Sequence, residues 1–225
     1  MYIHAMEWNS DAELFDLLLS TLYTPVLGDV LDAEGFRHQF LPQPIRPLRE
    51  EMRLAGRAMP VQLADAASQE EPPFRRLIES LDQIRPGEIY LATGGSQNCA
   101  AWGEILTATA KARGGAGAVI DGFHRDTPRV LEQNWPVFSR GSYAQDAAIR
   151  SRVVDYRCEV EIAAVRVRPG DLVFADIDGV LIVPREREGD IVAAALQKAR
   201  GEKLVRKEIE AGATAATAFR KYGVL

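Results

Sequence analysis

Apolar positions along this chain recur with two spacings, and each spacing predicts a kind of secondary structure. Apolar residues three or four positions apart predict helices, whereas short apolar runs bounded by turn residues predict strands. The first pattern predicts helices at residues 11–22, 24–34, 74–84, 101–112, 128–133 and about 190–222. The second pattern predicts strands at residues 54–63, 88–92, 116–120, 135–138, 158–167, 172–175 and 180–183.

The order of these elements predicts the fold class. Strands are numerous, and only some of them are separated by helices. This order favours a mixed sheet system with helices outside it over a regular alternation of strands and helices. No repeat, low-complexity tract or obvious linker interrupts the 225 residues, so we expect residues 1–225 to form a single α/β domain.

The most informative stretch, GGSQNCAAWGEILTATAKARGGAGAVIDGFHRD, runs from Gly94 to Asp126. Its pattern predicts a glycine turn, a helix, a buried strand and a polar loop. Glu104 lies near the helix start, and twenty residues separate it from the Arg125–Asp126 pair. If the helix packs back against the strand, these side chains and the free amides of the helix N-terminus share one pocket. Such a pocket can hold a divalent metal ion together with a small carboxylate.

Simpler explanations stay open for these residues. Arg–Asp neighbours are common on protein surfaces, and a glutamate in a first helical turn can simply interact with the helix dipole. The turn Gly94–Gly95–Ser96 could bind phosphate, but it lacks the GK[ST] ending of a P-loop and the complete GxGxxG of a dinucleotide site. We therefore favour a turn around Gly95 whose amides face a small carboxylate.

Composition and charge narrow the class of protein. The chain has 47% hydrophobic residues, a net charge of −5 and no long basic run, which indicates a sizeable core and argues against a nucleic-acid partner. No apolar stretch is long enough to span a membrane, and the N-terminus lacks the pattern of a signal peptide.

Cys99 and Cys158 have no metal-ligand spacing, which favours reduced thiols and a cytoplasmic location. The isolated His4, His38 and His124 exclude an HExxH zinc site.

Two patterns argue against other enzyme classes. The run ADIDGVL at 175–181 is similar to the nucleophile loop of haloacid-dehalogenase phosphatases, but only 47 residues follow Asp178, too few for the rest of that fold. A turn at Asp178–Gly179 between antiparallel strands is favoured instead.

A Schiff-base aldolase needs a buried lysine, and the body of the chain offers only Lys111 near a helix end. If the protein is a carbon–carbon lyase, a metal ion is therefore the expected means of stabilising an enolate.

Longer motifs cover nearly the whole chain. They are TPVLGDVLD at 24–32, IRPLREEMRLAGRAMPVQ at 45–62, the glycine turn and WGE at 94–104, GAGAVIDGFHRD at 115–126, PVFSRG at 136–141, PGDLVFADIDGVLIVP at 169–184 and the ending FRKYGVL. In these motifs the chain resembles the family of the regulator of ribonuclease activity A (RraA), which includes the 4-hydroxy-4-methyl-2-oxoglutarate aldolases. An acidic residue followed, after twenty residues, by Arg–Asp is the core of this resemblance.

The resemblance implies a fold, an assembly and an activity. The fold is an α/β/β/α sandwich with mixed sheets, assembled as a homotrimer or homohexamer, with the site at the subunit boundary and the C-terminal helix at about 190–222 at a subunit interface. The activity is that of a class II aldolase with Mg²⁺ or Mn²⁺, which cleaves a 4-hydroxy-2-oxo acid of the 4-hydroxy-4-methyl-2-oxoglutarate type to pyruvate. Oxaloacetate decarboxylation leaves the same pyruvate enolate and is the implied side activity. Some family members instead inhibit a ribonuclease, so a non-catalytic protein-binding regulator is the alternative.

The resemblance also implies roles for individual residues. Asp126 would bind the metal ion directly. Arg125 would bind the substrate carboxylate or keto oxygen and stabilise the enolate. The backbone amides of Ile105 and Leu106 would receive the pyruvyl carboxylate, and Glu104 would hold a metal-bound water or act near it.

Three positions leave questions open. The family's aldolases usually have aspartate at the position of Glu104, so the additional methylene puts substrate preference and rate in question. The family's acidic residue from a neighbouring subunit would fall near Glu202, for which a solvated helix charge is the simpler explanation. His124 stands where an apolar residue is frequent, and an exposed loop histidine is favoured over a proton carrier in the pocket.

Overall fold

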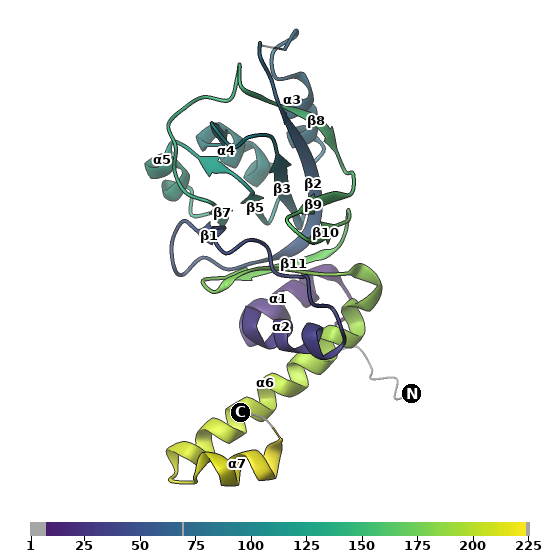
Figure 1. Ribbon diagram of the computed structural model, residues 1–225, viewed down its shortest axis with the longest axis vertical. Coiled ribbons are helices and arrows are strands. Elements are labelled where there is room, and N and C mark those ends of the chain that lie inside the picture. The colour runs from purple at the N-terminus through teal and green to yellow at the C-terminus, as the bar shows by residue number, and fades with distance from the viewer. Residues whose placement is uncertain (1–7, 69, 224–225) are drawn as a thin grey trace.

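The computed structural model describes residues 8–68 and 70–223, and its centre is one mixed sheet (Figure 1). The strands follow the order β1–β7–β5–β3–β2–β11–β12, and β8 pairs with β2 beside this path. They are β1 (Arg46–Pro47), β2 (Leu54–Asp65), β3 (Glu88–Gly94), β5 (Gly117–Ile120), β7 (Val137–Ser139), β8 (Ser151–Tyr156), β11 (Leu172–Asp176) and β12 (Gly179–Val183). Two small sheets are the parallel pair β4 (Ala100–Trp102) with β6 (Phe123–His124) and the hairpin β9 (Val160–Ile162) with β10 (Val165–Val167).

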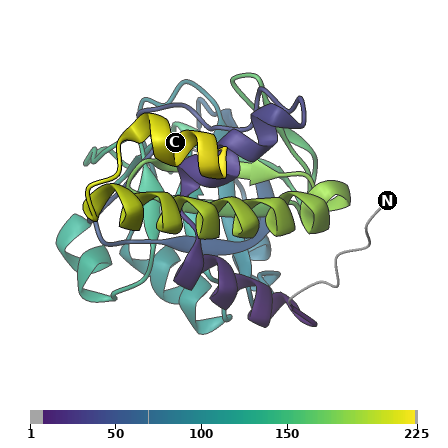
Figure 2. The same ribbon diagram turned by 90° about the horizontal axis from the view of Figure 1, so that it is seen from below.

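Helices cover both outer faces of this sheet. They are α1 (Asp11–Thr21), α2 (Thr24–Ala33), α3 (Arg75–Asp82), α4 (Glu104–Ala112), α5 (Thr127–Glu132), α6 (Glu188–Glu210) and α7 (Ala215–Tyr222), with a short 3₁₀ turn at Arg185–Arg187 before α6. Figure 1 shows α1, α2 and α6 beside β11, and α3, α4 and α5 around the opposite half of the molecule. Figure 2 shows α7 folded back beside α6, where Tyr222 Oη donates to Glu208 at 2.8 Å.

The alternation of side chains along the strands explains this layering. On β11, Val173 and Ala175 face an inner core, whereas Leu172 and Phe174 pack with apolar residues of α1, α2 and α6. On β3, Leu91 faces the same inner core, whereas its neighbours pack with residues of α3, α4 and α5. The two halves of the sheet therefore face each other across a shared core, each with helices on its outer face. This arrangement confirms the predicted α/β/β/α sandwich with a mixed sheet in a single domain.

The strand β2 joins the two halves. It pairs with β11 through residues 54–57, with β3 through residues 57–63 and with β8 through residues 61–65. Pro60 lies where the pairing with β11 has ended and that with β8 begins, and its carbonyl accepts from Arg157 N at 2.8 Å. A proline is tolerated inside this strand because its missing N–H falls at the change of partner.

The two ends of the sheet lie close together. Arg46 of β1 donates from Nη1 to the carbonyls of Ile177 and Asp178, which form the β11–β12 turn, at 2.9 and 2.6 Å. Residues 39–41 run along β12, where Leu41 N donates to Val180 O at 2.9 Å. These contacts cover strand edges that would otherwise be open to pairing with another chain.

Some predicted elements have different bounds in the structure. Ala101 lies in β4 and not in the predicted helix at 101–112, because the helix begins only after Gly103. The predicted strand at 158–167 is wrong as one strand. It is the β9–β10 hairpin, with Ala163 in the left-handed region at φ 54°. The predicted helix at about 190–222 is divided into α6 and α7 at residues 211–214, where Gly212 has φ +101°.

The predicted hairpin between the strands at 172–175 and 180–183 is confirmed, but its turn lies one residue earlier than the predicted Asp178–Gly179. Asp176 pairs with Gly179 across the β11–β12 hairpin, so Ile177 and Asp178 form the two-residue loop. The Asp176 carboxylate is buried and accepts from Thr24 N at 2.8 Å and from Thr24 Oγ1 at 2.6 Å. It therefore ties the start of α2 to the sheet, which gives this aspartate a structural role.

Within residues 8–68 and 70–223, no single helix is long and apolar enough to cross a membrane. The helices α1 and α2 reach that length and apolar composition only together, and they are bent by 106° relative to each other.

The buried ion pair between β2 and α6 generates a stability prediction. Arg57 and Glu188 have side chains that are 9% and 11% exposed, and Arg57 also donates from Nε to Asp11 of α1 at 2.9 Å. We expect Arg57→Met to lower the free energy of unfolding by about 3–5 kcal/mol, because Glu188 is left buried without its cation. Urea denaturation measures this loss.

The matched control for that variant is Arg113→Met. Arg113 pairs with Asp82 at 2.5 Å, but both side chains are about half exposed. Its loss should cost only about 0–1 kcal/mol. Equal losses for the two variants would contradict the assignment of Arg57 as the cation that holds β2, α1 and α6 together.

Candidate active site

A parallel pair of short strands brings the predicted residues together. The pairing of β4 with β6 sets Trp102 opposite His124, and Arg125 N donates to Trp102 O at 2.9 Å. The chain then continues into α4 on one side and toward Asp126 on the other. The start of α4 and the Arg–Asp pair are therefore adjacent because the two strands end side by side.

Gly103 allows the Asp126 carboxylate to approach the start of α4. Asp126 Oδ2 lies 3.4 Å from Glu104 N, and Asp126 itself has a left-handed backbone conformation at the N-cap of α5. A Cβ added at Gly103 would lie only 2.8 Å from Asp126 Oδ2. Any other residue at position 103 would therefore push this carboxylate away from the helix N-terminus.

Arg125 lies between two carboxylates. Its Nη1 is 2.8 Å from Asp146 Oδ1, and its Nε is 3.7 Å from Asp126 Oδ2. All three side chains are between 39% and 49% exposed, so they remain accessible to a ligand. The contact with Asp146 fixes the direction of the guanidinium more firmly than the contact with Asp126 does.

Asp146 is a site residue that the sequence did not reveal. It belongs to the loop before β8 and forms an isolated bridge with Ala100 of β4. It lies twenty residues beyond Asp126 in an ordinary polar loop. Only the pairing of the loop with β4 brings it to the pocket.

These residues line a pocket of about 480 Å³. Glu104, Arg125, Asp126 and Asp146 form its polar side. The predicted residues Ile105 and Leu106 also line it, and α3 supplies a wall that includes Phe74, Leu77, Ile78 and Leu81. A volume of this size suits a small organic ligand.

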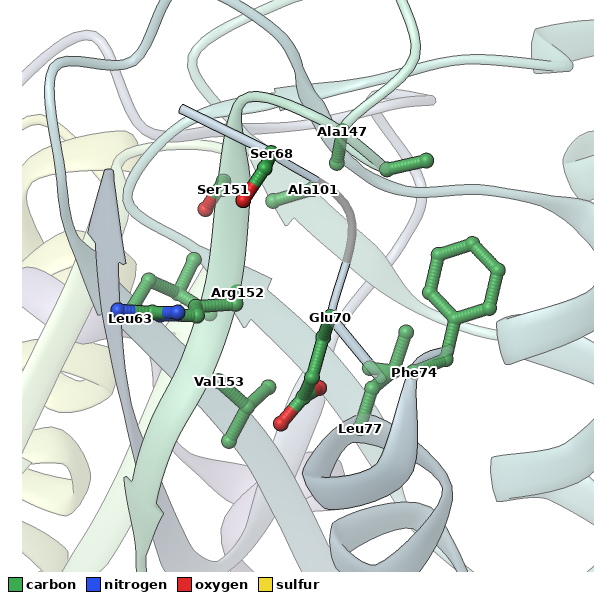
Figure 3. A pocket seen from close by; sticks show the side chains of 11 residues that line it. Leu63, Ser68, Glu70, Phe74, Leu77, Ala101, Ala147, Ser151, Arg152 and Val153 are labelled. Atoms are coloured by element: carbon green, nitrogen blue, oxygen red, sulfur yellow. The ribbon is translucent and has the colours of Figure 1, made fainter. Parts of the chain in front are cut away.

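A smaller hollow adjoins this pocket between β8 and the start of α3 (Figure 3). Its volume is about 50 Å³, and its charged lining groups are Glu70 and Arg152. Phe74 and Leu77 line both cavities. The small hollow is too small to hold a substrate-sized molecule. Its shared lining residues mark one edge of the larger pocket.

Two predicted site residues lie elsewhere in the chain. Gly95 lines a separate narrow recess, where the neighbouring Ser96 N donates to Asp65 Oδ1 at 2.7 Å. Glu202 lines a hollow between α2 and α6, where it accepts a hydrogen bond from Tyr23 Oη and lies 3.9 Å from Lys198 Nζ. Burial, together with Glu202, raises the pKa of Tyr23 to about 12. Within one chain, neither Gly95 nor Glu202 contributes to the pocket at α4.

The expectation that His124 is an exposed loop histidine is wrong. Its side chain is buried, with Nδ1 2.7 Å from Ser139 Oγ and Nε2 2.9 Å from Thr127 Oγ1. Burial lowers the pKa of His124 below its ordinary value. The ring is thus held between two hydroxyls, where it supports the loop that carries Arg125 and Asp126.

The polar side of the pocket fits a hydrated divalent cation better than a closed protein cage. No group of three or more histidine, cysteine, aspartate or glutamate side chains arranged to hold a metal ion occurs in the described part of the chain. Mg²⁺ commonly uses one or two carboxylates and keeps several waters. Asp126, with Glu104 beside it, offers carboxylate donors of this kind facing an open pocket.

Comparisons with known proteins agree with this fold. The family model described as RraA-like (Aldolase/RraA) matches residues 24–182, so the chain belongs to the RraA-like family. A protein of Halalkalibacterium halodurans named "Putative 4-hydroxy-4-methyl-2-oxoglutarate aldolase" is 27% identical over 212 residues, which cover 93% of this chain and 96% of that protein. Protein DlpA of Legionella pneumophila is 29% identical over 87% of this chain, but the match spans only 32% of DlpA.

A solved structure shows the same fold. Streptomyces coelicolor RraAS2, described as an unusual member of the RNase ES inhibitor RraA protein family, superposes with a TM-score of 0.77. Its sequence is 29% identical, and the match covers 88% of this chain and 98% of RraAS2. The proteins similar to this chain therefore include one named as a putative aldolase and one described as a member of a ribonuclease-inhibitor family.

The close approach at Gly103 generates a structural prediction. We expect Gly103→Ala to displace the Asp126 carboxylate, because the new Cβ would lie 2.8 Å from Oδ2. A crystal structure of the variant should show a longer separation between Glu104 N and Asp126 Oδ2 than 3.4 Å. Gly122→Ala is the control, since a Cβ there meets only Ile120 Cγ2 at 3.7 Å. An unmoved Asp126 in the Gly103 variant would refute the steric argument.

The buried ring of His124 generates a prediction about pH. Its pKa is lowered from 6.5 in the folded protein, so the unfolded chain binds a proton at a higher pH than the folded protein does. The contribution of His124 to stability is therefore complete above pH 6.5 and decreases as the pH falls toward the folded-state pKa. An NMR titration, with the signal assigned by its loss in a His124→Gln variant, should give a pKa below 6.5. A value at or above 6.5 would contradict this view of the site.

Proposed function

We propose that the protein is a metal-dependent pyruvate aldolase that cleaves a 4-hydroxy-2-oxo acid to pyruvate, with oxaloacetate decarboxylation as a side activity. The observation that carries the proposal is the convergence of Asp126, Glu104 and Arg125 on the N-terminus of α4 in one pocket. The name of the H. halodurans relative supports it. Mg²⁺ or Mn²⁺ is the proposed cofactor, with Asp126 as its protein ligand and Glu104 beside it.

The start of α4 and Arg125 provide a site for the pyruvyl unit. The first amides of a helix have no partner within the helix, and Ile105 and Leu106 occupy this turn. A carboxylate received there is also favoured by the helix dipole. Arg125 can then direct a second hydrogen bond to the carboxylate or to the keto oxygen, so the 2-oxo acid is held at both of its oxygen-bearing carbons.

The same residues favour cleavage of the bond between C3 and C4. The proton of the C4 hydroxyl leaves to Glu104 or to a water that it holds, and the C3–C4 electron pair moves into the enolate of pyruvate. The Arg125 guanidinium stabilises the negative charge that develops on the enolate oxygen. A divalent cation held by Asp126 would supply further positive charge to the pocket. Oxaloacetate loses CO₂ to leave the same enolate.

The position of Lys111 supports this route over a Schiff base. Its Nζ donates to the carbonyl of Gln133 at 2.5 Å, at the C-terminal end of α4. The helix begins at the pocket, so this amine lies at the opposite end of α4 from Glu104. A ketone bound at the helix start is therefore out of reach of Lys111.

We further propose that the active unit is a homotrimer or homohexamer in which the C-terminal helices form part of a subunit interface. Glu202 lies outside the pocket of its own chain. It is therefore proposed to reach the pocket of a neighbouring subunit. The alternative function is a protein-binding regulator of the ribonuclease-inhibitor kind, as the name of RraAS2 suggests.

Pyruvate release tests the proposed activity. With Mg²⁺ present, the protein should release pyruvate from members of a panel of 4-hydroxy-2-oxo acids and from oxaloacetate, and EDTA should stop the release. Asp126→Asn should remove this metal-dependent turnover, a loss of several kcal/mol of transition-state stabilisation. Asp190→Asn, whose side chain is 84% exposed on α6, is the control and should keep it. EDTA-resistant turnover, or a fully active Asp126→Asn variant, would reject the metal-dependent mechanism.

A further inference from the structure

The pocket at α4 has two chemically different halves. Its polar half contains Glu104, Arg125, Asp126 and Asp146. Its other half, built by α3 and by the first turn of α4, is mainly apolar, with Phe74, Leu77, Ile78, Leu81, Ile105 and Leu106, and it carries one acidic residue, Asp82, at the end of α3. The pyruvyl unit proposed above contacts Arg125 and the backbone amides at the start of α4, so it uses none of these apolar side chains. The apolar half therefore faces whatever lies beyond the C3–C4 bond of the substrate.

The apolar half is not filled by the protein itself. Ile105 is 70% exposed, Ile78 is 53% exposed and Phe74 is 41% exposed. Large apolar side chains gathered with this exposure along one wall of a cavity mark a binding surface for apolar groups.

The charges around the pocket point to the same kind of group. Among the described residues that line the pocket, Arg125 is the only one with a cationic side chain. Four of the lining residues are acidic, namely Asp82, Glu104, Asp126 and Asp146. Asp82 is paired with Arg113, which does not line the pocket. A second carboxylate on the substrate would thus meet no other cation among the side chains that line the pocket, since Arg152 lines only the adjoining smaller hollow, and it would be repelled by the acidic side chains.

From this division we infer that the substrate is a monocarboxylic 4-hydroxy-2-oxo acid with an alkyl or aryl substituent at C4, and that dicarboxylic analogues bind less well. The inference rests on the proposed function. In the reaction the C4 hydroxyl loses its proton, C4 becomes the carbonyl carbon of an aldehyde or ketone, and the C3–C4 electron pair forms the pyruvate enolate. A proton from water then completes the methyl group of pyruvate. The second product is accordingly an apolar aldehyde or ketone.

Equilibrium binding tests the inference without turnover. The acids 2-oxohexanoate and 2-oxoadipate have the same chain length and differ only in a terminal methyl or carboxylate, and neither has the C4 hydroxyl needed for cleavage. Isothermal titration calorimetry with Mg²⁺ present should show 2-oxohexanoate bound roughly tenfold more tightly, through burial of its alkyl end and the repulsion of the second carboxylate. Equal or tighter binding of 2-oxoadipate overturns the inference, and so does failure of both acids to bind.

A charge placed on the α3 wall should reverse the preference. Ile78→Lys adds a cation to the apolar half, so it should strengthen binding of 2-oxoadipate several-fold and weaken binding of 2-oxohexanoate. The control is Ile177→Lys, since Ile177 is 45% exposed in the β11–β12 turn and does not line the pocket. It should leave both affinities unchanged. If Ile78→Lys alters sedimentation and leaves both affinities unchanged, a second copy of the chain covers this wall and the inference is wrong.

Turnover separates this inference from the proposed function. With 4-hydroxy-2-oxohexanoate the expected products are pyruvate and propanal, formed at a higher kcat/KM than pyruvate from 4-hydroxy-4-methyl-2-oxoglutarate. Faster cleavage of the dicarboxylate keeps the aldolase function and rejects the apolar substituent. Preferential binding of 2-oxohexanoate without pyruvate release from any acid rejects the aldolase function and keeps the ligand class.

Discussion

The hydrogen bonding of β2 is the constraint on which the rest of this structure depends. Its twelve residues pair with β11, β3 and β8 in turn, so one strand belongs to both halves of the sandwich. Its outward-facing residues change their surroundings accordingly, from Ala55 among α1, α2 and α6 to Met59 and Val61 among α3, α4 and α5. A one-residue slip in its register would turn these side chains to the wrong face in both halves at once. The Arg57 ion pair with Glu188 is placed at the beginning of this strand, where it connects the strand to α6.

The register of β2 determines the geometry of the site through a series of strand pairings. β2 fixes β3, β3 fixes β5, and the chain after β5 returns as β6 beside β4. Gly103 follows β4 and Asp126 lies two residues beyond the end of β6, so the two residues lie within contact distance of each other. The absence of a side chain at Gly103 is the local condition that lets the carboxylate reach the helix start. The buried ring of His124, held by Ser139 and Thr127, keeps the second strand end in place.

Sequence patterns predicted those parts of this arrangement that depend on local chemistry. The start of α4 near Glu104 and a hairpin between β11 and β12 follow from helix periodicity and turn residues, and both are present, with the hairpin turn one residue earlier than predicted. The strands β4 and β6 have three and two residues, too few for any periodicity to emerge. In β8 only Val153 is buried among polar neighbours, so its pattern is that of a loop. The place of Asp146 in the pocket and the burial of His124 depend on contacts between segments that are distant in the sequence. Local sequence patterns do not predict such contacts.

The charge of the pocket bears both on the proposed metal ion and on the proposed preference for an apolar substituent. Three carboxylates, Glu104, Asp126 and Asp146, line the polar half of the pocket together with the single guanidinium of Arg125, which already contacts Asp126 and Asp146. The polar half is thus net negative, and an anionic 2-oxo acid must compete with Asp146 for Arg125. A divalent cation beside Asp126 would remove this conflict by supplying positive charge where the acid's oxygens bind. The same imbalance disfavours a second carboxylate elsewhere in the pocket. One electrostatic condition therefore supports both the requirement for a metal ion and the preference for an apolar substituent.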